Sequence, residues 1–288
     1  MHCEEFSPDA SLTPFIRSYF FISVKLATFH FPADGCPGLI INLGEPFLLG
    51  FEQGHLTEIV GCRLFGSQTR NLLTKHVAKQ TTLLAVKFNP GQLTRFFNIP
   101  AIELTDTSAS LQALWGSFGK EMEHRLLETE TIANRLRLLD HTFVKRLSNR
   151  KPFDARISAA LNAIWRSKGR VRIRQLAQAL DLSPRHLDRR FLDCVGLTPK
   201  RMCRIIRFLG VFSSMNSIRS LDWADLAIAN GYSDQAHLIR ECRYFTGHSP
   251  RSYLKNRSSL ERAIIGTADT MSHFFNTSGI SSHMMPQK

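Results

Sequence analysis

One local pattern occurs twice in the C-terminal third of this chain, and this repeat constrains the fold more than any other feature. The two copies lie 51 positions apart (187 to 238), and the matched pairs are Leu187 with Leu238, Arg189 with Arg240, Gly196 with Gly247 and Pro199 with Pro250. Four matches at one fixed offset are rare by chance. Self-similarity at a fixed spacing therefore indicates two copies of one structural unit.

The first copy predicts a helix-turn-helix unit. Ser183 is a good N-cap, Pro184 suits the first helical position, and Gly196 suits the position just after a helix. Between them, apolar residues recur at helical spacing, at Leu187, Phe191 and Val195. A further amphipathic helix is predicted over residues 171–180, with a short turn at 181–182 between the two helices. The second helix of such a unit can lie in the major groove of DNA.

The excess positive charge of the chain lies in the same part. The formal net charge is +13, and 21 of the 37 Lys and Arg residues, but only 8 of the 24 Asp and Glu residues, fall within residues 150–257. The remaining 16 of each kind cancel. A basic half joined to a neutral half indicates a polyanionic partner for the basic half alone.

This half of the chain resembles the DNA-binding domain of the AraC/XylS family of transcription regulators, which carries two helix-turn-helix units joined by a linker helix. Besides the repeated residues, the resemblance rests on the stretch ADLAIANGYSDQAHL at residues 224–238. We expect a first helix over residues 153–168 and the linker helix over residues 198–215. One departure is Cys242, where the family prefers phenylalanine, so we expect looser packing of the second unit.

The resemblance assigns base-facing positions on both recognition helices: Arg185, Asp188 and Arg189 in the first unit, and Gln235, Ala236, His237 and Arg240 in the second. These side chains can bind the edges of bases. An arginine fits guanine, and the Asp188 carboxylate can accept from the cytosine amino group. Gln235 fits adenine, and the Ala236 methyl group can contact the thymine methyl. Arg240 suits guanine or phosphate. Asp188 has an alternative role, a salt bridge that orients Arg185 or Arg189.

Five further cations are candidates for phosphate contacts, which position a protein on DNA without reading its sequence. They are Arg190, Lys200, Arg201, Arg243 and Arg251. The alternative for each of them is an ordinary surface cation.

Residues 6–100 predict a mostly β structure with an apolar interior. Apolar runs of strand length lie at residues 20–24, 39–43, 47–51 and 83–88, and turn signals separate them. Many short, closely spaced strands are typical of a sandwich or a barrel. Four short strings also resemble the N-terminal domain of a subgroup of the same family: LTPFIRSY (12–19), PADGC (32–36), VKFNPG (86–91) and IPAIELTD (99–106).

From residue 108 to residue 147 the pattern becomes helical, with two apolar rows: Leu111, Trp115, Phe118 and Met122, then Leu136, Leu139, Phe143 and Leu147. These rows pack either on the strands of their own domain or against a second subunit.

We place a polar linker at residues 147–152. The expected organisation is α+β: a β-rich regulatory or dimerisation domain (1–148), an all-α domain with two helix-turn-helix units (153–256), and a partly disordered tail (257–288).

Enzyme signatures are weak in this sequence. The six cysteines lack C-x-x-C spacing, and neither Cys36 nor Cys62 lies in the Pro-Cys-His-Arg context of the repair methyltransferases related to the family. We expect no catalytic residue, no metal site and no cofactor; His30, His55 and His76 are spread apart and are read as structural. The start of the chain is not a secretory signal, and no run of eighteen apolar residues occurs.

The sequence therefore predicts a bacterial, cytoplasmic, sequence-specific transcription regulator. Expected partners are double-stranded DNA, RNA polymerase, a small-molecule effector and a second copy of the chain bound through the N-terminal domain, but no membrane. The effector-binding residues are not identified. Two alternatives remain open: an architectural DNA binder without an effector, and a DNA-repair enzyme that carries a regulator-type domain.

Overall fold

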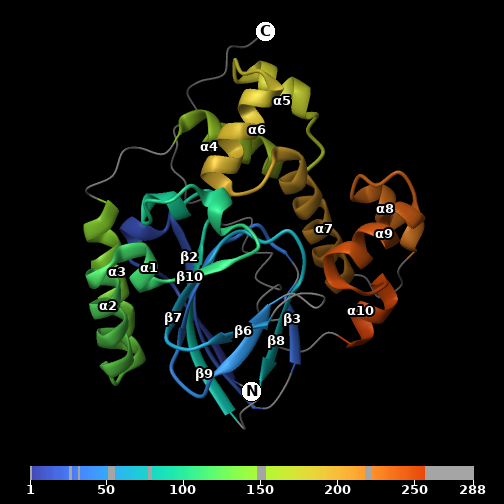
Figure 1. Cartoon of the computed structure of the whole chain (residues 1–288). Helices are drawn as coiled ribbons and strands as arrows, with labels where there is room; N and C mark the ends of the chain where they lie inside the picture. The colour runs from blue at the N-terminus through green and yellow to red at the C-terminus, as the bar shows by residue number, and fades with distance from the viewer. Residues whose placement is uncertain are drawn as a thin grey trace.

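The computed structural model describes residues 2–25, 28–31, 33–50, 56–76, 80–147, 154–217 and 222–256. Its first part is β-rich, and its second part is helical (Figure 1). This arrangement confirms the predicted α+β fold class. The linker predicted at 147–152 falls, except for Leu147, outside the described residues, as does the predicted tail at 257–288.

Two antiparallel sheets form the β-rich part. The six-stranded sheet has the order β1-β2-β9-β4-β7-β10 and the four-stranded sheet the order β3-β8-β5-β6. The bounds are β1 (His2–Phe6), β2 (Ile16–Lys25), β3 (Thr28–Phe31), β4 (Gly38–Asn42), β5 (Phe47–Gly50), β6 (Leu56–Ile59), β7 (Cys62–Phe65), β8 (Leu72–His76), β9 (Gln80–Phe88) and β10 (Ser108–Ser110). The four predicted runs lie in β2, β4, β5 and β9, so the sequence located fewer strands than the fold contains.

The central strand β9 is covered on both faces, which explains its unbroken apolar run. Leu84, Val86 and Phe88 pack in a cluster with the helices that follow the strands. Leu83 belongs instead to a cluster that includes Phe47 of the second sheet. Alternate residues of one strand thus serve two apolar layers.

Three helices cover the outer face of the six-stranded sheet: α1 (Leu111–Trp115), α2 (Ser117–Glu128) and α3 (Ile132–Leu147) (Figure 1). Leu111, Met122, Leu139 and Phe143 are buried in the same cluster as the strands, so these helices pack on their own sheet. The predicted helical region differs in two details. Residues 108–110 form strand β10 paired with β7, and Gly116, at φ +64°, interrupts the first apolar row. The contact with a second subunit stays a prediction.

The helical part contains α4 (Ala155–Arg166), α5 (Ile173–Ala179), α6 (Pro184–Val195), α7 (Pro199–Ser217), α8 (Trp223–Ala229), α9 (Gln235–Thr246) and α10 (Pro250–Asn256). The first unit, α4 to α6, lies above the sheets in Figure 1, and α7 descends from it to the second unit, α8 to α10. Three short 3₁₀ turns complete the fold: η1 (Ala10–Leu12), η2 (Leu93–Arg95) and η3 (Ala101–Leu104).

Candidate nucleic-acid interface

Helix α6 is the first predicted recognition helix, and its ends form as the sequence predicts. The Ser183 hydroxyl oxygen accepts a hydrogen bond from the His186 backbone N–H at 3.2 Å, and Pro184 occupies the first turn. Gly196 ends the helix in the left-handed conformation at φ +80°. Leu187 and Phe191 are fully buried, which anchors the inner face of the helix and fixes which residues face outward.

The outer face of α6 carries the three predicted base-facing residues. Arg185 and Arg189 are exposed, and Asp188 is half-buried. No ion pair joins Asp188 to either arginine among the described residues. In the free protein the Asp188 carboxylate is therefore not held by a salt bridge to its neighbours on the helix.

Helix α9 is the second predicted recognition helix. The Asp234 carboxylate caps it by accepting from the His237 backbone N–H at 2.7 Å, and this hydrogen bond, with a second from Ser233, lowers the pKa of Asp234. Leu238, Cys242 and Phe245 are buried, as the repeat predicts.

On the other face of α9, Gln235, Ala236 and Arg240 are exposed. His237 is half-buried, since its ring lies edge-on to Tyr232 at 5.2 Å and its Nδ1 is 3.1 Å from the Ser233 hydroxyl. The histidine ring is thus held beside the helix N-terminus rather than projecting freely from it.

The orientation of α9 depends on a buried acid that the sequence did not single out. Glu241 is 8% exposed, and Arg204 of α7 donates two hydrogen bonds to its carboxylate, at 2.7 and 3.0 Å. The Arg204 guanidinium also lies 4.7 Å from the ring centroid of Tyr244. This two-pronged hydrogen bond joins α9 to α7.

Helix α7 is the linker helix that joins the two units. It contains 19 residues, which span about 28 Å at ~1.5 Å per residue. Helix α6 directly precedes α7, and α9 contacts the first half and the middle of α7, where Phe245 stacks on Phe208 and Tyr244 accepts from Arg201. A separation of one DNA turn, ~34 Å, between the two predicted recognition helices stays a prediction.

The structure separates the five phosphate candidates into two groups. Lys200, Arg243 and Arg251 are exposed. Arg190 forms an ion pair with Asp154, and the Arg201 guanidinium donates to the Tyr244 hydroxyl at 2.6 Å. Arg190 and Arg201 thus already have protein partners, and each joins two helices of its own half.

The C-terminal end of α6 is docked on the β-rich part. The Ser67 hydroxyl donates to the Val195 carbonyl at 2.8 Å, and the Thr105 hydroxyl donates to the Gly196 carbonyl at 2.6 Å. Both carbonyls belong to the end of a helix, where backbone acceptors lack intrahelical partners. The contact leaves the first turns of α6 exposed, and these are the turns with which helix-turn-helix proteins contact bases.

Two family comparisons match separate parts of the chain. Residues 176–256 match a family described as "Helix-turn-helix domain", and residues 4–110 match a family described as "Domain of unknown function (DUF6597)". No curated protein matches the chain.

Solved structures give a distant likeness. ToxT from Vibrio cholerae is similar with a TM-score of 0.46 at 12% identity, over 82% of this chain and 98% of that one. A structure of wild-type ToxT from Vibrio cholerae strain SCE256 with a bound unsaturated fatty acid gives 0.44 at 11% identity, over 82% and 94%. The AraC-like transcriptional activator CuxR gives 0.26 at 12% identity, over 73% and 86%.

The described residues contain neither a membrane-spanning helix nor a metal-binding cluster. Within the described ranges, no helix is long and apolar enough to cross a membrane. The same residues contain no group of three or more His, Cys, Asp or Glu side chains arranged to hold a metal ion.

Proposed function

Because residues 176–256 match a helix-turn-helix domain and the sequence of this half resembles the AraC/XylS type, we propose that the protein is a sequence-specific transcription regulator. Residues 153–256 bind double-stranded DNA, and residues 1–148 regulate that binding. α6 and α9 enter two successive major-groove segments on one face of the duplex. The observation that carries the proposal is the pair of capped helices with exposed arginines at matching positions, Arg189 and Arg240, held on one linker helix.

The two units read different sequences in this proposal. The first presents Arg185, Asp188 and Arg189, whereas the second presents Gln235, Ala236, His237 and Arg240. Their operator half-sites therefore need not be palindromic, because the two helices differ, and one polypeptide suffices to contact both. Lys200, Arg243 and Arg251 supply phosphate contacts, and Arg190 and Arg201, which also contact Asp154 and Tyr244, stay candidates for the same role.

Regulation by a small molecule acts through the docked end of α6. Ser67 bridges the two halves, because its hydroxyl lies 3.3 Å from the Gly35 carbonyl and 2.8 Å from the Val195 carbonyl. Ala33, two residues before Gly35, belongs to the same buried cluster as Leu197 and Met202 of the helical part. A conformational change in the loop that contains residues 33–37 would therefore alter the contacts that hold the C-terminal end of α6.

The test compares Arg189→Ala and Arg240→Ala on selected operator DNA and on a scrambled duplex. We expect each variant to lose ~10- to 100-fold in affinity for the operator, because a bidentate base contact discriminates by ~1–3 kcal/mol. On the scrambled duplex we expect a much smaller loss. Arg137→Ala, an exposed arginine on α3, is the matched control and should change neither affinity.

Equal losses on both duplexes would reject base reading and favour an architectural DNA binder, whose affinity depends mainly on salt. The remaining alternative is a DNA-repair enzyme with a nucleophilic cysteine. Burial raises the pKa of Cys36 to about 11 and raises that of Cys62 further, so both thiols are protonated at neutral pH. A reactive cysteine needs the opposite shift, and an alkyl-transfer assay should therefore be negative.

A further inference from the structure

The apolar core of the first helix-turn-helix unit extends to the second unit. Helix α9 belongs to the second unit, yet its buried residues divide between two clusters. Leu238 packs in a cluster with Trp223 of α8. Cys242 and Phe245 belong instead to the cluster that contains Phe191 of α6. The C-terminal half of the second recognition helix is therefore buried together with the core of the first unit.

The two units also contact each other directly, through one turn of each. The turn between α4 and α5, residues 167–172, carries Arg170, and the turn between α8 and α9, residues 230–234, carries Gly231. A Cβ added at Gly231 would lie 2.8 Å from Cδ and 2.9 Å from Cγ of Arg170, so the arginine stem lies against the glycine backbone. Gly231 has a φ of +78°, which glycine adopts without strain. The second turn thus has both the shape and the space that this contact needs.

Arg207 of α7 lies between the two turns. Its Nη1 donates to the Gly169 carbonyl at 3.3 Å, and its Cδ would lie 3.6 Å from a Cβ at Gly231. Gly169 itself packs on the backbone of α7, because a Cβ there would clash with the carbonyl oxygen of Cys203. One turn of each unit is therefore held against the same part of the linker helix.

The part of Arg170 that contacts the second unit is its hydrocarbon stem. Among the described residues Arg170 forms no ion pair, and its Nε donates to the Ser167 carbonyl of its own turn at 3.3 Å. The residue as a whole is exposed, so the guanidinium reaches solvent while the methylene groups cover Gly231. The stem and the charge can therefore be tested separately.

This contact adds a second point of attachment for α9. Glu241 and Phe245 attach the C-terminal half of α9 to α7, whereas Gly231 lies just before the N-terminus of α9. A helix attached near one end can pivot about that point. A helix attached near both ends has a fixed direction.

We propose that Arg170 is a positioning residue: its stem fixes the direction of α9 relative to the first unit and so determines which spacing between the two DNA segments the protein accepts. The inference rests on the proposed function, because spacing matters only if α6 and α9 contact one duplex. A turn of DNA is ~34 Å and contains about 10 base pairs, so one inserted base pair moves the second segment by about 3.4 Å and rotates it by about 35°. A second recognition helix of fixed direction cannot follow this displacement.

The first experiment compares the selected operator with a version that has one base pair inserted between its two segments. The wild-type protein should bind the longer operator ~10- to 100-fold more weakly, because α9 then loses a bidentate base contact. Arg170→Ala removes the stem and should reduce this ratio to about threefold or less, since a freed α9 can follow the second segment. Arg170→Met keeps an unbranched stem without the charge and should retain the wild-type ratio. Arg172→Ala, at another exposed arginine of the same turn, is the matched control and should also retain it.

The second experiment needs no DNA. Spin labels on a non-canonical amino acid at positions 185 and 235 report the distance between the N-termini of α6 and α9. The distance distribution should be equally narrow in the wild-type protein and in Arg170→Met, and broader in Arg170→Ala. Truncation of an exposed side chain changes stability little, and a thermal melt of each variant verifies that it folds.

An equally narrow distribution in Arg170→Ala would overturn the proposal, as would an unchanged operator ratio in that variant. Equal binding of both operators by the wild-type protein would also overturn it. Loss of the ratio in Arg170→Met would assign the effect to the charge instead of the stem and would reject the proposal as well. If the wild-type protein shows no preference for the operator over scrambled DNA, the proposed function is refuted, and the label distances still decide the role of Arg170.

Discussion

The Arg204–Glu241 pair gives the sharpest prediction about the geometry of the DNA-binding half. Glu241→Gln keeps the volume of the side chain but removes its charge, and one of the two hydrogen bonds at 2.7 and 3.0 Å loses its acceptor. A hydrogen bond between charged groups contributes ~1.5–3 kcal/mol. The Arg204 side chain is 25% exposed, so water solvates part of the freed guanidinium, and we expect a net loss of about 1–2 kcal/mol.

The loss should be local to the second unit. Hydrogen exchange measures the free energy of opening for each helix separately. In Glu241→Gln, amides of α9 and α10 should exchange faster by ~5- to 30-fold, which is the equivalent of 1–2 kcal/mol, while amides of α4 and α6 stay unchanged. Glu121→Gln, at an exposed position on α2, is the control with the same chemical change.

Glu241→Gln should weaken binding to a two-segment operator more than binding to the half-site of α6 alone. The reason is that the variant weakens the contact between α9 and α7 and leaves α6 unchanged. Unchanged exchange in α9 would refute the view that this ion pair positions the second recognition helix. Equal acceleration in α6 and α9 would also refute it, since the pair would then stabilise the whole half rather than one unit.

Three further predictions concern other contacts. Ser183→Ala removes the N-cap of α6 and should lower the free energy of unfolding by ~1 kcal/mol in urea denaturation, whereas Ser183→Asp should retain it. Ser67→Ala combined with Thr105→Val removes both hydroxyls that hold the end of α6, at ~1 kcal/mol each, and should accelerate amide exchange at that end; an unchanged rate would exclude a docking role. Burial raises the pKa of Cys194 to about 11, so its reaction with a thiol reagent should be slow at pH 7 and accelerate about tenfold per pH unit up to that value; a fast reaction at pH 7 would contradict this.

The local patterns of the sequence were sufficient for the helix-turn-helix units. Ser183, Pro184 and Gly196 mark the ends of α6, and the structure places its boundaries at Pro184–Val195. The linker helix, predicted over residues 198–215, is observed at Pro199–Ser217. Such features are predictable because caps and apolar periodicity act within a few residues of each other. Four apolar runs located β2, β4, β5 and β9, whereas β1, β3, β6, β7, β8 and β10 were missed.

The candidate site was less predictable. The roles of the predicted DNA-contacting residues stay predictions, and the sequence offered no sign that two of them, Arg190 and Arg201, contact Asp154 and Tyr244 in the folded chain. It gave no signal for Glu241, whose partner Arg204 lies 37 positions earlier. No periodic pattern relates two such residues, because their contact depends on how α7 and α9 cross.

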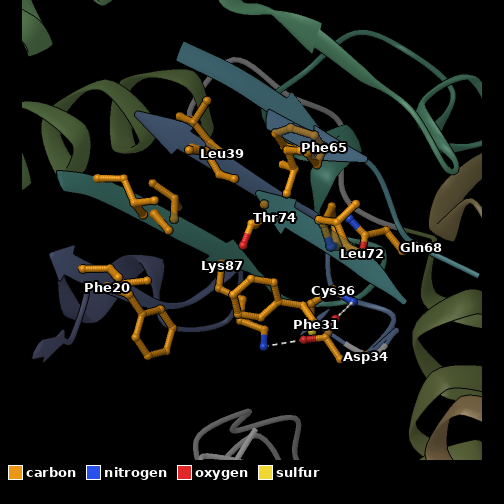
Figure 2. A pocket seen from close by; sticks show the side chains of 18 of the residues that line it. Phe20, Phe31, Asp34, Cys36, Leu39, Phe65, Gln68, Leu72, Thr74 and Lys87 are labelled. Atoms are coloured by element: carbon orange, nitrogen blue, oxygen red, sulfur yellow. Dashed lines mark hydrogen bonds and ion pairs between the residues drawn. The ribbon is translucent and has the colours of Figure 1, made fainter. Parts of the chain in front are cut away.

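The sequence by itself determined the repeat, the segregation of positive charge and the local geometry of each recognition helix, since these depend on near neighbours and on composition. Tertiary structure alone decided where the β-rich part holds α6, through contacts such as Ser67 with Val195 across 128 positions. It also decided that side chains of both sheets, such as Phe20 and Leu49, line one common pocket (Figure 2). These groups are far apart in the sequence and meet only when the elements pack together. Their contacts therefore cannot be predicted from the spacing of residues along the chain.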